Sequence, residues 1–182
     1  MDVGARLKKA RSMKNLSQRE LAKRAGVTNS TISMIEKNSV SPSVSSLKKV
    51  LGGIPLSMVE FFSMAVESTD EEAVVYRADE MLEIGSEGIS MRLVGKGRGK
   101  RNLAFLDERY EAGSDSGEDM LKHDGEEAGI VIEGRFELTV NGKVYILEKG
   151  DSYYFDSVLP HRFRNPFDEA CHLVSCTSPA DF

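Results

Sequence analysis

The spacing of hydrophobic residues changes once along this chain, near Ala73, and this change limits the fold more than any other feature. Before it, apolar residues recur at intervals of three and four, which is typical of amphipathic helices. After it, apolar and polar residues alternate in short runs between turn residues, which is typical of β-strands. A polar, acidic stretch at residues 63–72 separates the two patterns. The chain of 182 residues is therefore predicted to hold a helical domain at 1–65, a linker at 66–73 and a β-rich domain at 74–182.

The two predicted domains carry opposite net charge. Residues 1–65 contain 11 basic and 4 acidic side chains, and residues 66–182 contain 13 basic and 25 acidic ones, so the net charges are +7 and −12. A basic domain followed by an acidic one favours nucleic acid binding by the first domain alone. The N-terminus lacks an apolar signal core, and no run of about 18 apolar residues occurs. We therefore expect a cytoplasmic protein that has no membrane partner.

Residues 17–38 have the features of two short helices joined by a tight turn. Ser17 and Glu20 have the spacing of a capping box at the start of the first helix. Gly26 supplies the left-handed residue that ends this helix, and Thr28 can cap the next one. The outer face of the second helix carries short hydrogen-bonding side chains, which suit the major groove of DNA because bases are distinguished there by their donors and acceptors.

This run resembles the helix-turn-helix of the Cro/C1-type (XRE) DNA-binding family, and the resemblance covers about residues 3–62. It implies a bundle of five helices, with the others at 3–14, 43–51 and 55–62. It also implies an ion pair between Arg11 and Glu36 and a phosphate contact at Gln18. The residues that the resemblance assigns to the DNA interface are Gln18, Thr28, Asn29, Ser30, Ser33 and Lys37.

The β-rich part contains many short strands at regular spacing, which predicts an all-β sandwich or barrel. We expect strands at 74–76, 89–93, 103–110, 128–133, 136–140, 143–147, 152–155, 161–164 and 172–177. Asn141-Gly142 between two of them is a strong signal for a two-residue hairpin turn. Cys171 and Cys176 lie five residues apart on one strand and so point to opposite faces, which argues against a disulfide between them.

Two stretches, residues 117–134 and 150–165, resemble the two motifs of a cupin barrel. His123, Glu127 and His161 fall at metal-ligand positions of these motifs, but Leu121 stands where cupins have a further histidine. Two histidines and a carboxylate suit a divalent transition metal such as Zn, Ni, Mn or Fe. The alternative is that the two histidines form hydrogen bonds in a pocket without metal, and the sequence does not decide between the two.

A cupin behind a repressor-type helix-turn-helix is similar to bacterial regulators of putrescine and polyamine utilisation. This resemblance implies a repressor that binds a double-stranded DNA operator as a homodimer and senses a diamine or polyamine. A cationic amine requires carboxylates, and its methylene chain requires apolar or aromatic walls. The predicted effector ligands are Glu118, Glu126, Glu127, Tyr153, Phe155 and His161.

The other hypothesis is a metal-dependent cupin enzyme, a dioxygenase or an isomerase, with a DNA-targeting head. Its metal ligands would be His123, Glu127 and His161. Leu121 argues against it, because an enzyme of this fold usually keeps the complete ligand set. The sequence therefore favours a regulator that is not an enzyme.

Overall fold

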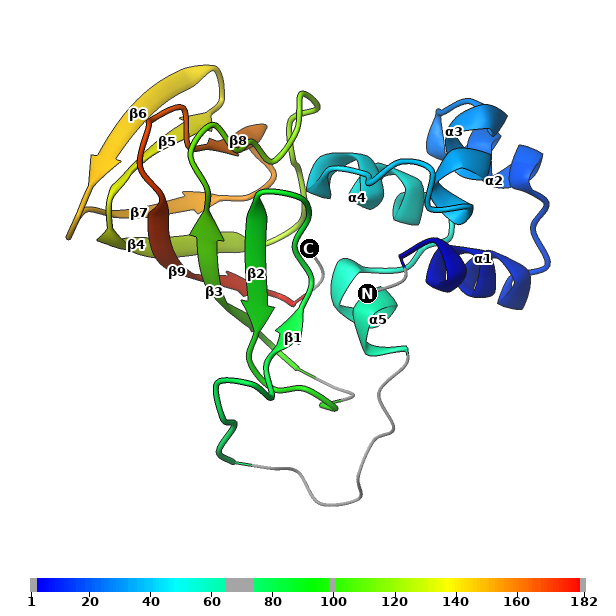
Figure 1. The fold of residues 1–182 in the computed structure, drawn as a ribbon, viewed down its shortest axis with the longest axis horizontal. Coiled ribbons are helices and arrows are strands. Elements are labelled where there is room, and N and C mark those ends of the chain that lie inside the picture. The colour runs from blue at the N-terminus through cyan, green and yellow to red at the C-terminus, as the bar shows by residue number, and fades with distance from the viewer. Residues whose placement is uncertain (1–2, 65–73, 99–100, 181–182) are drawn as a thin grey trace.

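The computed structural model describes residues 3–64, 74–98 and 101–180, and a helical part lies beside a β-rich part (Figure 1). The predicted linker at 66–73 lies outside the described residues. Among the described residues, no helix has the length and hydrophobicity that a membrane span requires. The architecture agrees with the predicted fold class, since five helices are followed by two facing β-sheets.

Five helices form the first part of the described chain, and local capping chemistry sets their ends. They are α1 (Val3–Met13), α2 (Gln18–Ala25), α3 (Asn29–Glu36), α4 (Val44–Gly52) and α5 (Met58–Ser63). The predicted capping box is present at the start of α2, because Ser17 accepts from the Glu20 amide and the Glu20 carboxylate accepts from the Ser17 amide. Gly26 ends α2 at a φ of 65°. The Thr28 side chain caps α3.

The fifth helix begins later than predicted. It starts at Met58 rather than at position 55, because Ser57 and Glu60 form a second capping box that fixes its first turn. The apolar sides of all five helices meet in one core. Its buried members include Leu7, Leu21, Ile32, Ile35, Leu47, Val50, Leu51, Met58 and Phe61.

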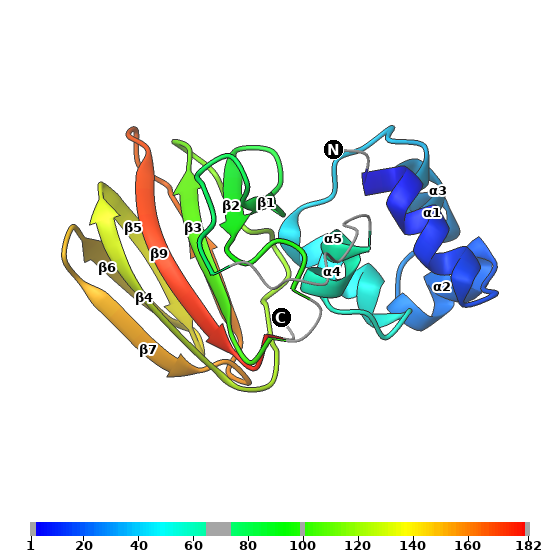
Figure 2. The same cartoon turned by 90° about the horizontal axis from the view of Figure 1, so that it is seen from below.

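Nine strands in the described residues form two antiparallel sheets that face each other (Figure 2). The larger sheet has the order β1-β2-β3-β9-β4-β7 and the smaller one the order β6-β5-β8. The strands are β1 (Leu82–Glu83), β2 (Ile89–Leu93), β3 (Ala104–Tyr110), β4 (Glu126–Glu133), β5 (Arg135–Val140), β6 (Lys143–Glu148), β7 (Ser152–Asp156), β8 (His161–Arg164) and β9 (Cys171–Ser178). Side chains that alternate inward along these strands fill the space between the sheets.

Most strand predictions are confirmed to within two residues, and one is wrong. Residues 74–76 form no strand. Both Val74 and Val75 are exposed, so there is no buried face for them to pair into. The short strand β1 was not predicted, because a two-residue strand carries no alternation to detect. The hairpin between β5 and β6 is confirmed, with Asn141 and Gly142 at φ values of 50° and 78°.

Helix α4 contacts the β-rich part. Figures 1 and 2 both place α4 between the barrel and α2–α3. The Ser45 amide donates to the Ser116 carbonyl at 3.1 Å. Lys49 Nζ lies 3.0 Å from Asp119 Oδ2 in an exposed ion pair. The contact is close, because a Cβ at Gly117 would lie 2.0 Å from Ser45 Oγ. The mouth of the barrel is thus covered by an element of the DNA-binding fold.

Candidate functional site

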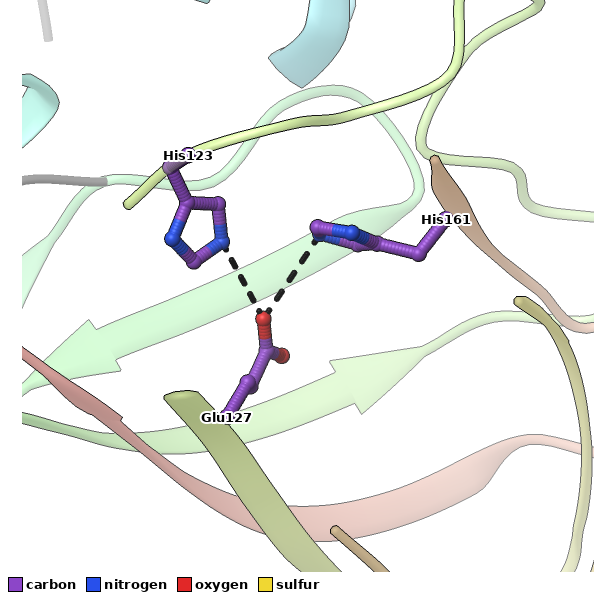
Figure 3. Close-up of side chains that lie close together, drawn as sticks. All are labelled: His123, Glu127 and His161. Atoms are coloured by element: carbon purple, nitrogen blue, oxygen red, sulfur yellow. Dashed lines mark ion pairs between the residues drawn. The ribbon is translucent and has the colours of Figure 1, made fainter. Parts of the chain in front are cut away.

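His123, Glu127 and His161 meet inside the barrel as the two motifs predicted (Figure 3). His123 Nε2 lies 3.3 Å from Glu127 Oε2. His161 Nε2 lies 3.7 Å from the same oxygen. One ligand atom from each residue lies within 4.8 Å of the others. We call these three residues the His–Glu–His cluster.

Backbone pairing places each member of the cluster. Glu127 pairs with Phe155 on one side and with Thr177 on the other, which turns its side chain inward. The His161 amide donates to the Leu121 carbonyl at 3.0 Å, and the Leu121 amide donates to the His161 carbonyl at 2.7 Å. The His123 amide donates to the Ser157 carbonyl at 3.0 Å. The segment before β4 is thus held against β8 and the turn before it, so that both imidazoles face the carboxylate.

Burial controls the protonation of the cluster. It lowers the pKa of His123 to about 4, and the positive charge of Lys48 acts in the same direction. Burial also lowers the pKa of His161, against the attraction of Glu127. Burial raises the pKa of Glu127 to about 7, although His161 and Lys48 both favour its charged form. At neutral pH the two imidazoles are therefore neutral, and Glu127 can gain or lose its charge when a cation arrives or leaves.

A second buried carboxylate lies in the same cavity, and the sequence did not reveal it. Glu108 is 4% exposed. It accepts from the Tyr110 hydroxyl at 3.1 Å and from the Ser175 hydroxyl. Burial raises its pKa to about 7. The only signal in the sequence was the alternation along β3, which places Glu108 on the inward face with Leu106 and Tyr110.

The barrel cavity around these groups is small and only partly enclosed. Its volume is about 20 Å³, room for about one water molecule. Two of its walls, Val44 and Lys48, belong to α4 of the helical part. The others are Met91, Leu106, Glu108, Tyr110, Ser116, Leu121, His123, Glu127, His161, Phe163 and Thr177. Burial lowers the pKa of Lys48 to about 8, while Glu127 favours its charged form, so Lys48 is mostly an ammonium at neutral pH.

The donor set fits a divalent transition metal. His161 Nδ1 lies 2.8 Å from the Leu159 carbonyl oxygen, which assigns its proton to Nδ1 and leaves the Nε2 lone pair facing Glu127. His161 Nε2 is buried and has no hydrogen-bond partner among the described residues. Leu121 is 9% exposed and lines the cavity. It therefore fills the place of the missing ligand with an alkyl group, and among the described residues the cluster offers three ligands.

The structure brings four of the six predicted effector ligands together. The Phe155 ring lies 5.0 Å from the His161 ring, and the Tyr153 ring lies 5.8 Å from the Phe155 ring. Gly129 makes room for Tyr153, since a Cβ there would lie 2.6 Å from its ring. Tyr153 and Phe155 thus form a row of ring contacts with His161, but neither lines the barrel cavity, and both line a separate groove of about 740 Å³ along β5, β6 and β7.

The other two predicted effector ligands lie outside the barrel. Glu118 is exposed in the loop before β4. Glu126 is exposed because it precedes Glu127 on β4 and so points to the opposite face. Neither lines the barrel cavity, and neither is part of the effector site proposed below.

The predicted DNA interface is an open face on α2 and α3. The residues Thr28, Asn29, Ser30 and Lys37 are exposed, and Ser33 is half-buried. Thr28 also caps its helix, since its hydroxyl accepts from the Thr31 amide at 3.1 Å. Gln18 was expected to bind phosphate, and in this structure its amide group donates to Glu36 Oε2 at 2.8 Å. Glu36 in turn binds Arg11, so the predicted ion pair is present.

Two family models match the two parts of the chain. A model described as a helix-turn-helix matches residues 7–61. One described as a cupin domain matches residues 106–177. Fold and site together define a transcriptional regulator with a helix-turn-helix DNA-binding domain and a cupin domain.

Relatives identify the family within this class. The chain is 44% identical over 179 residues to the HTH-type transcriptional regulator PuuR of Escherichia coli (strain K12), and the match covers 98% of this chain and 96% of that protein. The chain belongs to the PuuR family of regulators, which confirms the family that the motifs predicted. The HTH-type transcriptional regulator SutR of E. coli is 25% identical over 171 residues, which cover 93% of this chain and 90% of SutR.

Solved structures support the arrangement of the fold. A helix-turn-helix transcriptional regulator from Vibrio cholerae matches 97% of this chain and 94% of its own, with a TM-score of 0.70 and 19% identity. An RmlC-like cupin from Shewanella frigidimarina matches 62% of this chain and 96% of its own, with a TM-score of 0.50 and 21% identity. At these identities the likeness concerns the fold alone.

Proposed function

We propose that this regulator represses genes of putrescine utilisation and that a diamine or polyamine in its barrel relieves the repression. The observation that supports this most directly is the pair of buried carboxylates, Glu108 and Glu127, in one cavity. Buried carboxylates without cations are costly, and their raised pKa values record that cost. A diamine supplies two ammonium groups on an apolar chain and so matches two carboxylates between aromatic walls.

In this proposal the helical part binds a two-fold operator, and the protein acts in the cytoplasm as a homodimer. Half-sites in successive major grooves lie about 34–36 Å apart, which requires two heads held at fixed spacing. Asn29, Ser30 and Ser33 read bases, Thr28 caps the reading helix and contacts DNA beside them, and Lys37 and Gln18 contact phosphates.

We further propose that the edges of the two sheets form the dimer interface. Strands β6 and β7 are edge strands of their sheets. Their outer side chains are unusually apolar, with Val144 54%, Ile146 51% and Tyr154 68% exposed. A self-complementary apolar patch is what a two-fold dimer requires. Ile146→Glu is therefore expected to give a monomer in sedimentation experiments, whereas Val74→Glu, at a valine that is 93% exposed and belongs to neither edge strand, is expected to remain dimeric.

A divalent transition metal (Zn, Ni, Mn or Fe) is the second candidate occupant. It is favoured by His161, whose Nε2 lone pair faces the cavity. His123, Glu127 and His161 would hold it, and it would supply a Lewis acid. Lys48 would have to move away from Glu127 for either cation, so it does not distinguish a metal ion from an amine. Leu121 leaves a metal-dependent dioxygenase or isomerase without its fourth ligand, so we propose that the barrel senses and does not catalyse.

The test is an operator titration with the full-length chain, followed by fluorescence anisotropy. Addition of 1,4-diaminobutane is expected to weaken operator binding, and Glu127→Gln is expected to lose this response while binding the operator as the wild type does. Glu126→Gln is the matched control, because the same change is made at the neighbouring exposed position. Loss of operator binding by a folded Glu127→Gln variant would disprove the assignment of sensing to the barrel.

A further inference from the structure

Lys48 places an amine from the DNA-binding fold inside the sensor cavity. It lies on α4, and its side chain lines the cavity together with His123 and Glu127. Its charge acts on each member of the His–Glu–His cluster, favouring the charged form of Glu127 and the neutral forms of both histidines. A lysine side chain consists of four methylenes and one ammonium. It thus corresponds to a four-carbon diamine whose second ammonium is replaced by attachment to a helix.

The helix that carries Lys48 cannot move without the helical bundle. On its other side α4 buries Leu47, Val50 and Leu51 in the core of the bundle, each at most 4% exposed. The Ser45 amide bonds the barrel through the Ser116 carbonyl. If Lys48 moves further than its side chain can rotate, α4 must move with it. The bundle then moves as well, together with the face that carries Asn29 and Ser30.

Lys48 also separates the cavity from solvent. An outer groove of about 660 Å³ runs between α4, α5 and residues 120–122. Its lining residues are Ser45, Lys48, Lys49, Gly52, Leu56, Ser57, Glu60, Met120, Leu121 and Lys122. Lys48 and Leu121 belong to both this groove and the inner cavity, whereas the inner cavity alone has only about 20 Å³. A diamine that enters from the outer groove must displace Lys48 or Leu121 to reach Glu127.

We propose that Lys48 is a tethered competitor of the amine effector: it occupies the effector's ammonium position at Glu127, holds α4 on the barrel, and is expelled with α4 when the effector binds. This inference rests on the proposed function and adds the route by which the sensor reaches the DNA-binding face. The outer groove is the entrance, and the exchanged groups are two ammoniums of the same chemistry. The exchange conserves the charge next to Glu127, so the closed and the liganded states can have similar energies, as a switch requires.

The experiment compares three variants of the full-length chain with the wild type. Lys48→Met keeps most of the side-chain length and removes the charge, and Lys48→Arg keeps a cation. Lys49→Met is the matched control, because Lys49 is the next residue on the same helix and also bonds the barrel, through Asp119, but outside the cavity. Calorimetry measures the binding of 1,4-diaminobutane, and anisotropy measures how far saturating diamine weakens operator binding.

Lys48→Met is expected to bind the diamine about tenfold more tightly than the wild type, because no competitor has to be expelled. The same variant is expected to lose most of the diamine effect on operator binding. Lys49→Met and Lys48→Arg are expected to keep both properties close to the wild type. Equal or weaker diamine binding by Lys48→Met, with the wild type binding well, would overturn the competitor role and leave the proposed function standing.

A measurement without any effector tests whether Lys48 holds α4 on the barrel. Hydrogen exchange of the Ser45 amide reports whether α4 is docked, since this amide donates to the Ser116 carbonyl. Lys48→Met is expected to speed this exchange severalfold and Lys49→Met to change it less. If none of the proteins binds the diamine, the proposed effector is wrong and so is the competition. Unchanged exchange in Lys48→Met would show that Lys48 does not hold α4 on the barrel.

Discussion

Arg11 and Glu36 form a two-pronged ion pair between α1 and α3, with Nε to Oε1 at 2.6 Å and Nη2 to Oε2 at 3.0 Å. The Glu36 side chain is 3% exposed, and it also accepts from Gln18 at the start of α2. Burial by itself would raise the pKa of Glu36, but the bonds from Arg11 and Gln18 outweigh it and the pKa is lowered. One carboxylate therefore joins the three helices that present the DNA-binding face.

Removing the arginine should destabilise the helical part. Arg11→Met leaves Glu36 buried without its main partner, and this type of change costs about 3–5 kcal/mol. The free energy of unfolding, from urea titration followed by helical circular dichroism, measures it. Lys9→Met, at an exposed position of the same helix, should change it by less than about 0.5 kcal/mol.

The pH dependence of this effect has a defined sign. Because the folded-state pKa of Glu36 is lowered, its contribution is present above the unfolded value of 4.5 and is lost as the pH falls through the folded value. The difference in the free energy of unfolding between Arg11→Met and the wild type should therefore become smaller at acidic pH. An equal difference at pH 7 and pH 3 would contradict the role of the charged carboxylate.

Glu108 should destabilise the barrel at neutral pH in the absence of a cation. Its folded-state pKa is raised from 4.5 to about 7 by burial, so the folded state loses stability as the pH rises from about 4.5 to about 7. Glu108→Gln removes this penalty and keeps a group that can bond Tyr110 and Ser175. At pH 8 the variant should be more stable than the wild type by up to about 3 kcal/mol, as measured by unfolding at several pH values.

Glu111→Gln is the control for this experiment, because Glu111 lies exposed just beyond β3. Its free energy of unfolding should depend on pH as that of the wild type does. The free energy of unfolding of Glu108→Gln should still fall somewhat as the pH rises, since burial also raises the pKa of Glu127. A Glu108→Gln variant that is less stable than the wild type at pH 8 as well as at pH 5 would show that the hydrogen bonds outweigh the charge.

The sequence predicted those features of fold and site that depend on local chemistry. The capping box at Ser17 and the turn at Asn141 need only their neighbours, and both are present. Adjacent residues of a strand point to opposite faces, so the alternation already contained the distinction between Glu126 and Glu127 that the ligand prediction overlooked.

The features that the sequence did not reveal depend on contacts between distant segments. Glu108 joins the site only because β3 and β4 both pair with β9 in the same sheet, which places Glu108 and Glu127 on the wall of one cavity. Lys48 joins it because α4 docks on the barrel mouth. No periodicity within either segment records such a contact, since docking is decided by the shapes of two completed surfaces.

Metal binding by the His–Glu–His cluster should depend on His161 and not on His172. Zinc or manganese at about 100 times its Kd should stabilise the wild type by about 2.7 kcal/mol, seen as a higher melting temperature. His161→Ala should abolish this shift. His172→Ala should keep it, because His172 Nε2 lies 2.5 Å from Asp107 Oδ1 between β9 and β3 and is not a member of the cluster. Equal shifts in both variants would place the metal outside the cluster.

Residues of the DNA-binding face that read bases and residues that contact phosphates should respond differently to substitution. Ser30 is exposed at the start of α3, where its hydroxyl can reach base edges, so Ser30→Ala should cost about 1–3 kcal/mol at one base position and relax the preference there. Lys37 is exposed just after α3, so Lys37→Met should weaken all sequences equally and lower the slope of log K against log salt by about 1. Operator titrations at several salt concentrations, with one substituted base pair at a time, distinguish the two effects. A base-specific loss in Lys37→Met would reassign Lys37 to the reading set, because a phosphate contact carries no sequence information.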